Sequence, residues 1–148
     1  MKHYKIGYTA GVFDLFHVGH LNLIERAKMQ CDYLIVAVTT DELVSYKNKK
    51  AVISFEERKR IVEAIRYVDK VVPQVNMNKM EAWEKYKFDV MFVGDDWRGT
   101  DKWNQYEKEF AAVGVDIVYF PYTKEVSSTM IAEKLKSNER CENDMGQK

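Results

Sequence analysis

The sequence predicts an α/β fold with a single Rossmann-like, doubly wound parallel sheet of about five strands and helices on both faces. Short apolar runs alternate with amphipathic stretches along most of the 148 residues. The longer runs are apolar almost without interruption, as expected for parallel strands that are buried on both faces. Because no Pro/Gly/Ser-rich linker and no internal repeat divides the chain, we expect one domain over residues 1–136, followed by a polar tail at 137–148.

The first half of the chain opens with a strand at Tyr4–Thr9 and continues with a helix and a second strand at Tyr33–Val38. The helix is indicated by apolar residues that recur on one face, namely Val18, Leu21, Ile24 and Ala27. The next helix begins at a predicted capping box, Ser54-Phe55-Glu56-Glu57, and its apolar stripe is formed by Ile61, Val62 and Ile65.

The second half repeats the alternation. Three further apolar runs are predicted as strands, at Lys70–Val72, Val90–Val93 and Val115–Phe120. Three helices are predicted beside them, at Met77–Tyr86, Asp101–Val113 and Ser127–Lys136, the last opened by a Ser-Ser-Thr cluster.

Composition narrows the possible partners and compartment. The chain has 23 basic and 23 acidic residues, so no broad basic surface for nucleic acid or an anionic membrane is expected. No apolar run approaches a membrane span, and the N-terminus has no secretory signal. Cys31 and Cys141 are too few and too far apart for a disulfide framework, which fits a reduced, cytoplasmic compartment.

The most informative motif joins the first strand to the first helix. There His17 and His20 are three residues apart with Gly19 between them, so both imidazoles lie on one side of a helix start. The helix N-terminus adds N–H groups and partial positive charge, which predicts an anion site for a phosphate. Two readings compete with it: a structural role for the histidines, and a zinc site in which Asp14 supplies the third ligand.

Three other loops should converge on the same crevice, because each follows the carboxyl end of a strand. They are the lysine loop 46–50, the segment Gly94-Asp95-Asp96-Trp97-Arg98-Gly99, and residues 122–129, which contain Tyr122, Ser127, Ser128 and Thr129. Each also has a plainer interpretation, as a solvated basic loop, a turn or a helix N-cap. Neither a P-loop nor a Gly-x-Gly-x-x-Gly motif is present. Together the loops favour direct phosphoryl or nucleotidyl transfer.

The stretch Gly-Val-Phe-Asp-Leu-Phe-His-Val-Gly-His at 11–20 resembles the signature of the cytidylyltransferase branch of the nucleotidyltransferase superfamily. The resemblance covers about residues 4–136. It includes Lys-x-Lys-Lys at 47–50, the Glu-Glu-Arg-Lys helix at 56–59, Ile-Arg-Tyr-Val-Asp at 65–69 and Gly-Asp-Asp-Trp at 94–97. The last motif and the short chain are most similar to the bacterial enzymes that act on glycerol 3-phosphate.

The resemblance implies transfer of CMP from CTP to a small alcohol phosphate, with Mg²⁺ held mainly by the triphosphate and without dedicated protein ligands. It also implies a homodimer, with Arg66 to Asp69 near the subunit contact, and a use in cell-wall or capsule synthesis if the product is CDP-glycerol. The implied catalytic residues are His17, His20 and Lys47, which neutralise charge at the transferred phosphate. The implied nucleotide contacts are Val12, Phe13, Asp14, Gly19, Lys49, Asp96, Tyr122, Thr123, Ser127, Ser128 and Thr129, and the implied acceptor contacts are Lys47, Lys79 and Arg66.

One departure bears on the substrate. Tyr122 stands where the family has a phosphate-binding arginine, and Glu125 where it has a glycine. A hydroxyl donates one hydrogen bond where a guanidinium offers a charged fork. Lys124 or Arg98 could restore the charge. Otherwise the acceptor is glycerol 2-phosphate, another polyol phosphate, phosphocholine or phosphoethanolamine. An adenylyltransferase of a sugar phosphate and a non-catalytic nucleotide-binding module remain the alternative functions.

Overall fold

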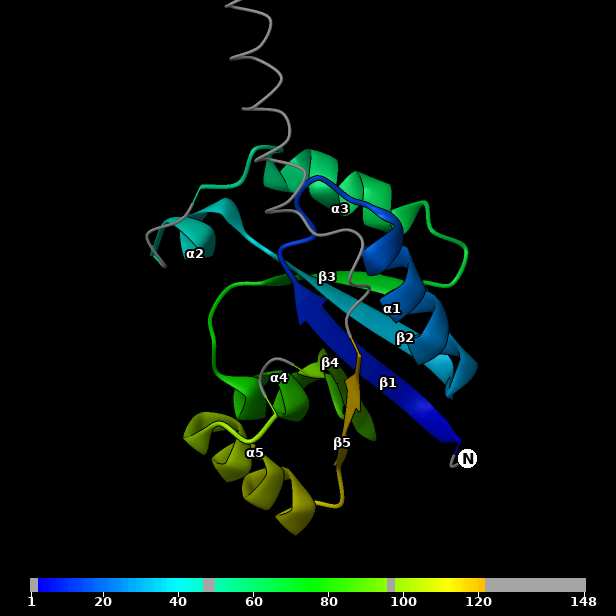
Figure 1. Ribbon diagram of the computed structural model, residues 1–148, viewed down its shortest axis with the longest axis vertical. Helices are drawn as coiled ribbons and strands as arrows, with labels where there is room; N and C mark the ends of the chain where they lie inside the picture. The colour runs from blue at the N-terminus through cyan, green and yellow to red at the C-terminus, as the bar shows by residue number, and fades with distance from the viewer. Residues whose placement is uncertain (1–2, 47–49, 96–97, 122–148) are drawn as a thin grey trace, which may run out of the picture.

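The computed structural model describes residues 3–46, 50–95 and 98–121, which form a five-stranded parallel sheet in the order β3-β2-β1-β4-β5 (Figure 1). From β1 the chain moves outward through β2 to β3, and then returns to the other side of β1 for β4 and β5. The order therefore reverses between β1 and β4, which confirms the predicted doubly wound sheet. The strands are β1 Tyr4–Gly11, β2 Cys31–Thr39, β3 Lys70–Gln74, β4 Val90–Gly94 and β5 Asp116–Phe120.

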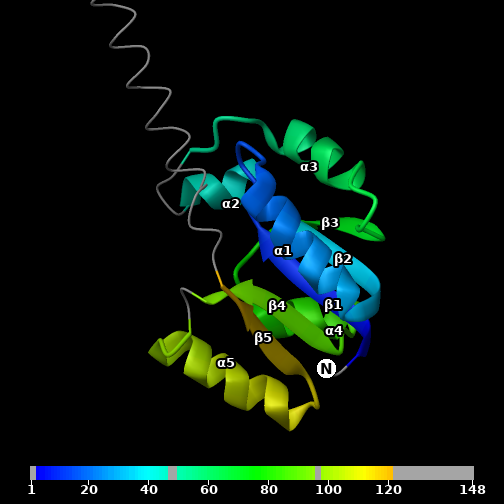
Figure 2. The ribbon, with the colours of Figure 1, turned by 45° about the vertical axis from the view of Figure 1, so that its right-hand side comes forward.

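Helices cover both faces of this sheet (Figures 1 and 2). On one face lie α1 (Val18–Met29) and α3 (Phe55–Glu63), and on the other lie α4 (Lys79–Tyr86) and α5 (Asp101–Ala112). Successive β2 residues divide between two apolar cores. Leu34, Val36 and Val38 pack in the core beneath α1 and α3, whereas Ile35 and Ala37 pack in the core beneath α4 and α5. The uninterrupted apolar run of β2 is thus explained by burial on both sides.

Polar side chains fix where several helices begin. Ser54 caps α3, with its Oγ accepting the Glu57 N–H at 3.4 Å, which confirms the N-cap half of the predicted capping box. Asn78 caps α4 by accepting the Glu81 N–H at 3.1 Å, so that helix begins two residues later than the predicted Met77. The predicted helix Ser127–Lys136 and the tail 137–148 lie outside the described residues.

The structure differs from the predicted helices in further details. A short helix, α2 (Asp41–Tyr46), was not predicted, because six residues are too few to show a helical period. The buried side of α3 is formed by Arg58 and Val62, while Ile61 is 38% exposed. Arg58 lies four residues before Val62 and shares its face, so the α3 stripe is rotated away from Ile61. Val18 of α1 is likewise half exposed.

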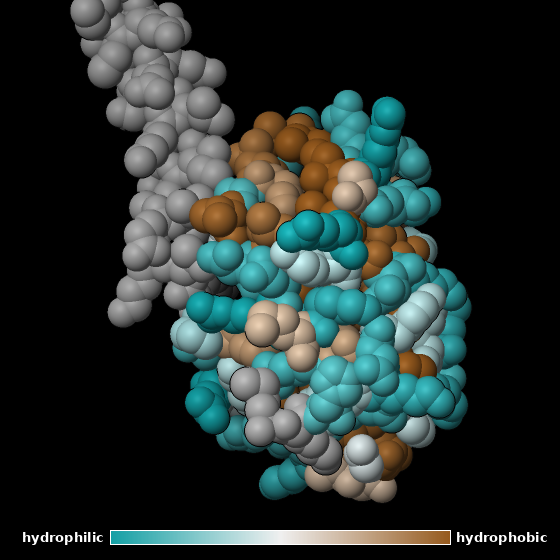
Figure 3. Space-filling view, turned by 90° about the vertical axis from the view of Figure 1, so that its right-hand side faces the viewer, coloured by the Kyte–Doolittle hydropathy of each residue, from teal (hydrophilic) through white to brown (hydrophobic). Residues whose placement is uncertain are grey.

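The surface carries some exposed apolar side chains, which include Val18, Val52 and Ile61. In the sequence these residues lie on or beside α1 and α3. Figure 3 shows apolar surface gathered at the upper end of the molecule, where Figure 1 places these two helices. None of the described helices is long and apolar enough to cross a membrane.

Candidate active site

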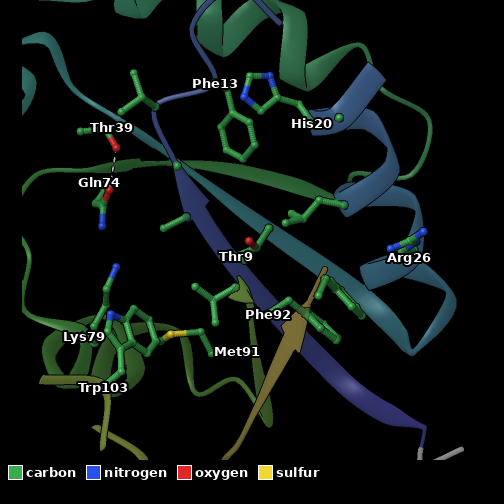
Figure 4. Close-up of a pocket in the computed structure, with 18 of the residues that line it drawn as sticks. Thr9, Phe13, His20, Arg26, Thr39, Gln74, Lys79, Met91, Phe92 and Trp103 are labelled. Atoms are coloured by element: carbon green, nitrogen blue, oxygen red, sulfur yellow. Dashed lines mark hydrogen bonds between the residues drawn. The ribbon is translucent and has the colours of Figure 1, made fainter. Parts of the chain in front are cut away.

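A pocket of about 430 Å³ opens where the strand order reverses, at the carboxyl ends of the strands (Figure 4). This is the position at which doubly wound sheets bind their ligands. One end of the pocket is lined by α1, and the other by the end of β3 with α4 and α5. The α1 end includes His17, Gly19, His20, Asn22 and Arg26, the middle includes Thr9 to Phe13, and the α4 end includes Thr39, Gln74, Met77, Lys79, Lys102, Trp103 and Tyr106.

The two histidines cap α1 through each other. His17 is the N-cap residue, and its Nδ1 accepts the N–H of Gly19 at 3.0 Å. The Nδ1 of His20 accepts the N–H of His17 at 3.3 Å. Their rings stack with centroids 3.9 Å apart at an angle of 22°. The prediction that both imidazoles lie on one side of the helix start is confirmed, and no acidic residue occupies the first turn of α1 to repel an anion.

This geometry determines the protonation of both rings. Because each Nδ1 accepts a backbone N–H, the proton of the neutral ring resides on Nε2, which is left as a hydrogen-bond donor. Burial lowers the pKa of His17, and burial together with the neighbouring His17 lowers the pKa of His20 to about 4. At neutral pH both rings are therefore uncharged and serve as hydrogen-bond donors.

Asp14 shapes the loop that carries the histidines. One carboxylate oxygen accepts the N–H groups of Leu15 and Ile53 at 3.1 and 2.9 Å, and the other accepts the Val52 N–H at 2.7 Å. The residues on either side, Phe13 and Leu15, have left-handed backbone conformations, with φ of 54° and 49°. Such conformations cost about 1–2 kcal/mol each in residues with a Cβ and persist only where the surroundings enforce them. Asp14 supplies that enforcement by joining the loop to the N–H groups of Val52 and Ile53.

Arg58 is a structural residue of the site to which the sequence analysis assigned no role. Its side chain is fully buried, and its guanidinium donates to the carbonyls of Val12 and Thr39, both at 2.7 Å. It also donates to the Ile53 carbonyl at 2.8 Å and pairs with Asp41 Oδ1 at 2.7 Å. One side chain thus joins the loop after β1, the end of β2, the start of α2 and the segment before α3.

The Asp41 carboxylate completes this junction. Its Oδ2 accepts the Phe55 N–H at 3.0 Å, and this bond, together with Arg58, holds the pKa of Asp41 below its usual value. The loops that frame the pocket are therefore tied together by one buried cation and by two carboxylates, Asp14 and Asp41. The signal in the sequence was the spacing of Arg58 four residues before Val62, which places it on the buried face of α3.

Of the predicted acceptor contacts, Lys79 lines the α4 end of the pocket and is only 8% exposed. Arg66 lies outside the pocket of this single chain. It is exposed, and its guanidinium donates to Tyr67 Oη at 3.1 Å. Eight further predicted site residues lie outside the described part of the chain: Lys47, Lys49, Asp96, Tyr122, Thr123, Ser127, Ser128 and Thr129.

Among residues 3–46, 50–95 and 98–121, no group of three or more His, Cys, Asp or Glu side chains could hold a metal ion. The expectation that Mg²⁺ is held mainly by the triphosphate stays a prediction.

Comparison with known proteins identifies the chain. A family model described as cytidylyltransferase-like matches residues 8–134, which include the histidine loop and all five strands except the start of β1. The chain belongs to this cytidylyltransferase-like family. The glycerol-3-phosphate cytidylyltransferase of Bacillus subtilis (strain 168) is 44% identical over 128 residues, which are 86% of this chain and 94% of the relative. The Staphylococcus aureus enzyme of the same name is 39% identical and covers 86% and 92%.

Solved structures share the fold at lower identity. A lipopolysaccharide core biosynthesis protein from Thermoplasma volcanium superimposes with a TM-score of 0.68 at 20% identity, covering 81% of this chain and 97% of that one. A pantoate-beta-alanine ligase from Francisella tularensis superimposes with a TM-score of 0.60 at 16% identity, covering 87% and 68%. These two structures support the Rossmann-like architecture alone.

Proposed function

We propose that this chain transfers CMP from CTP to glycerol 3-phosphate, forming CDP-glycerol and pyrophosphate. Two similar proteins, 39–44% identical over most of this chain, are named for that activity. The observation on this chain that carries the proposal is the histidine pair at the start of α1, which lines a pocket at the switch point of the sheet and whose Nδ1 atoms are both occupied by backbone N–H groups. A bound phosphate would find these histidines at the positive end of a helix.

The reaction is one in-line displacement. A phosphate oxygen of the acceptor attacks the α-phosphorus of CTP, and the bond from that phosphorus to the bridging oxygen of the β-phosphate breaks. Pyrophosphate leaves with the electron pair. No general base is needed, because a phosphate monoester is already ionised at neutral pH. His17 and His20 stabilise the transferred group by hydrogen bonds from Nε2, in the way that preorganised donors stabilise developing charge.

The charged groups of the mechanism come from the family resemblance. We assign Lys47 to the acceptor phosphate, Lys49 to CTP and Asp96 to the nucleoside. Ser127, Ser128 and Thr129 are assigned to the outer phosphates. Mg²⁺ carried by the triphosphate would neutralise charge on the leaving pyrophosphate. The neutral state of the histidines makes these charges necessary, because two uncharged donors do not balance a triphosphate.

We further propose that the enzyme is a cytoplasmic homodimer. The exposed apolar surface around α1 and α3 supports the dimer, and Arg66 lies three residues beyond the end of α3. A subunit contact there would place Arg66 against a second copy of the chain and would explain why it lies outside the pocket of one chain. Sedimentation equilibrium of the full chain tests this, with a monomeric mass as the contradicting result.

The activity is tested by measuring pyrophosphate release with each of the four nucleoside triphosphates against a panel of acceptors: glycerol 3-phosphate, glycerol 2-phosphate, ribitol phosphate, phosphocholine and phosphoethanolamine. The proposal predicts turnover with CTP and glycerol 3-phosphate at the highest kcat/KM. A preference for ATP would instead indicate an adenylyltransferase. Binding of CTP without product from any acceptor would indicate a nucleotide-binding module.

A further inference from the structure

The α4 end of the pocket contains a polar pair that the reaction as described does not use. Thr39 and Gln74 are the last residues of β2 and β3, and they face each other across the two strands. The Thr39 hydroxyl donates to Gln74 Oε1 at 2.6 Å. Both side chains are buried, Thr39 at 1% and Gln74 at 7% exposure, and both line the pocket.

The position of this pair is unusual for polar residues. Thr39 follows Ile35 and Ala37 on the same face of β2, and Gln74 follows Val72 on the same face of β3. An apolar residue at either position would continue the core at lower cost, because burying an amide and a hydroxyl loses their hydration. Apolar packing alone therefore does not account for these two side chains.

The Gln74 amide has donors left over. Its oxygen is taken by Thr39, which leaves the NH₂ group on the far side, and Figure 4 shows this nitrogen facing the space between Gln74 and Lys79. Within the described residues that nitrogen donates to no protein group, and it is not sealed from the pocket. A desolvated hydrogen-bond donor at the wall of a pocket selects ligands that carry a hydrogen-bond acceptor at that point.

We propose that Gln74, positioned by Thr39, is a specificity-determining residue that hydrogen-bonds a hydroxyl group of the acceptor alcohol. The inference rests on the proposed cytidylyl transfer. The anion site of the histidine pair is at the α1 end, so the transferred phosphate lies toward α1 and the acceptor's carbon chain extends toward α4. A neutral hydroxyl oxygen accepts from the Gln74 NH₂. An ammonium or trimethylammonium group has no hydrogen-bond acceptor for this NH₂ group, and its positive charge would lie near the Lys79 cation.

The test compares Gln74→Met with the wild type on glycerol 3-phosphate and on analogues that lack one or both hydroxyls: 3-hydroxypropyl, 2-hydroxypropyl and propyl phosphate. Each analogue is measured as a substrate or, where turnover is slow, as a competitive inhibitor. We expect KM for glycerol 3-phosphate to rise about tenfold in the variant, as for loss of one net hydrogen bond, with KM for CTP unchanged. For propyl phosphate the variant and the wild type should be equal.

Thr39 supplies the second arm. Thr39→Val keeps the shape of the side chain and removes the hydroxyl, so it should also raise KM for glycerol 3-phosphate. Thr39→Ser keeps a hydroxyl and should have a KM close to that of the wild type. An equal loss on all acceptors, propyl phosphate included, would reduce the pair to a structural role and overturn the inference. A changed KM for CTP would place the nucleoside here instead, with the same consequence. If the wild type forms no product from any polyol phosphate, the proposed function itself fails.

Discussion

Replacement of Arg58 by methionine tests the junction that holds the pocket loops together. The substitution removes the donors to the carbonyls of Val12, Thr39 and Ile53, and it removes the partner of Asp41. Each buried acceptor left without a donor costs about 1–3 kcal/mol. The Asp41 side chain is half exposed and regains water, so its loss is small. The three carbonyls left without a donor would together cost about 3–9 kcal/mol, and we expect a loss near the lower end of that range, about 3–5 kcal/mol, after the loops relax.

Urea denaturation followed by circular dichroism measures this loss, and the slope of unfolding free energy with urea checks that the unfolding remains two-state. Arg60→Met is the matched control, since Arg60 lies on the same helix with an exposed side chain. It should change the unfolding free energy by no more than about 0.5 kcal/mol. If Arg58→Met also lies within about 1 kcal/mol of the wild type, the account of the loop junction is refuted.

Three further predictions concern the site. The pKa of His20 falls from 6.5 to about 4 on folding, so the unfolded chain binds more protons between these pH values. The unfolding free energy should therefore decrease as pH falls through that window, by at most about 1.4 kcal/mol per pH unit. In His20→Gln, which keeps a capping residue, this part of the pH dependence should be missing, and parallel curves of unfolding free energy against pH for variant and wild type would contradict the prediction. Asp14→Ala removes the acceptor of three backbone N–H groups, so it should raise KM for CTP and lower the unfolding free energy by about 1–3 kcal/mol. An unchanged KM for CTP would show that the loop shaped by Asp14 does not contribute to nucleotide binding. Lys79→Met should lower kcat/KM for glycerol 3-phosphate and should lower the ratio of this kcat/KM to that for phosphocholine, measured with both substrates in competition. An unaltered ratio would show that Lys79 does not contact the acceptor substrate.

Much of the fold was predictable because its signals are local. The β2 run is apolar at successive positions since both faces of that strand are covered, and Ser54 caps α3 through its own side chain. The histidine site was predictable for the same reason: a strand, a turn and a helix start within a few residues fix where His17 and His20 lie.

The supporting interactions were not predictable, because they join segments that are distant in sequence. The spacing of Arg58 and Val62 places Arg58 on the buried face of α3, but it does not show which four carbonyl and carboxylate groups Arg58 binds there. The Thr39–Gln74 pair depends on the register of β2 with β3, across 35 residues. The neutral state of the histidines likewise depends on which ring nitrogen each backbone N–H reaches, which spacing alone does not give.

The central claim is that the His17–His20 pair stabilises cytidylyl transfer, and it is tested most directly by the rate of CDP-glycerol formation from CTP and glycerol 3-phosphate in His17→Ala and His20→Ala. His3→Ala is the matched control, because His3 is exposed and pairs with Asp32 away from the pocket. The account predicts that kcat falls about 10²–10³-fold in each pocket variant, with the fold intact by circular dichroism, and that it is unchanged in the control. Turnover close to that of the wild type in both pocket variants would contradict it.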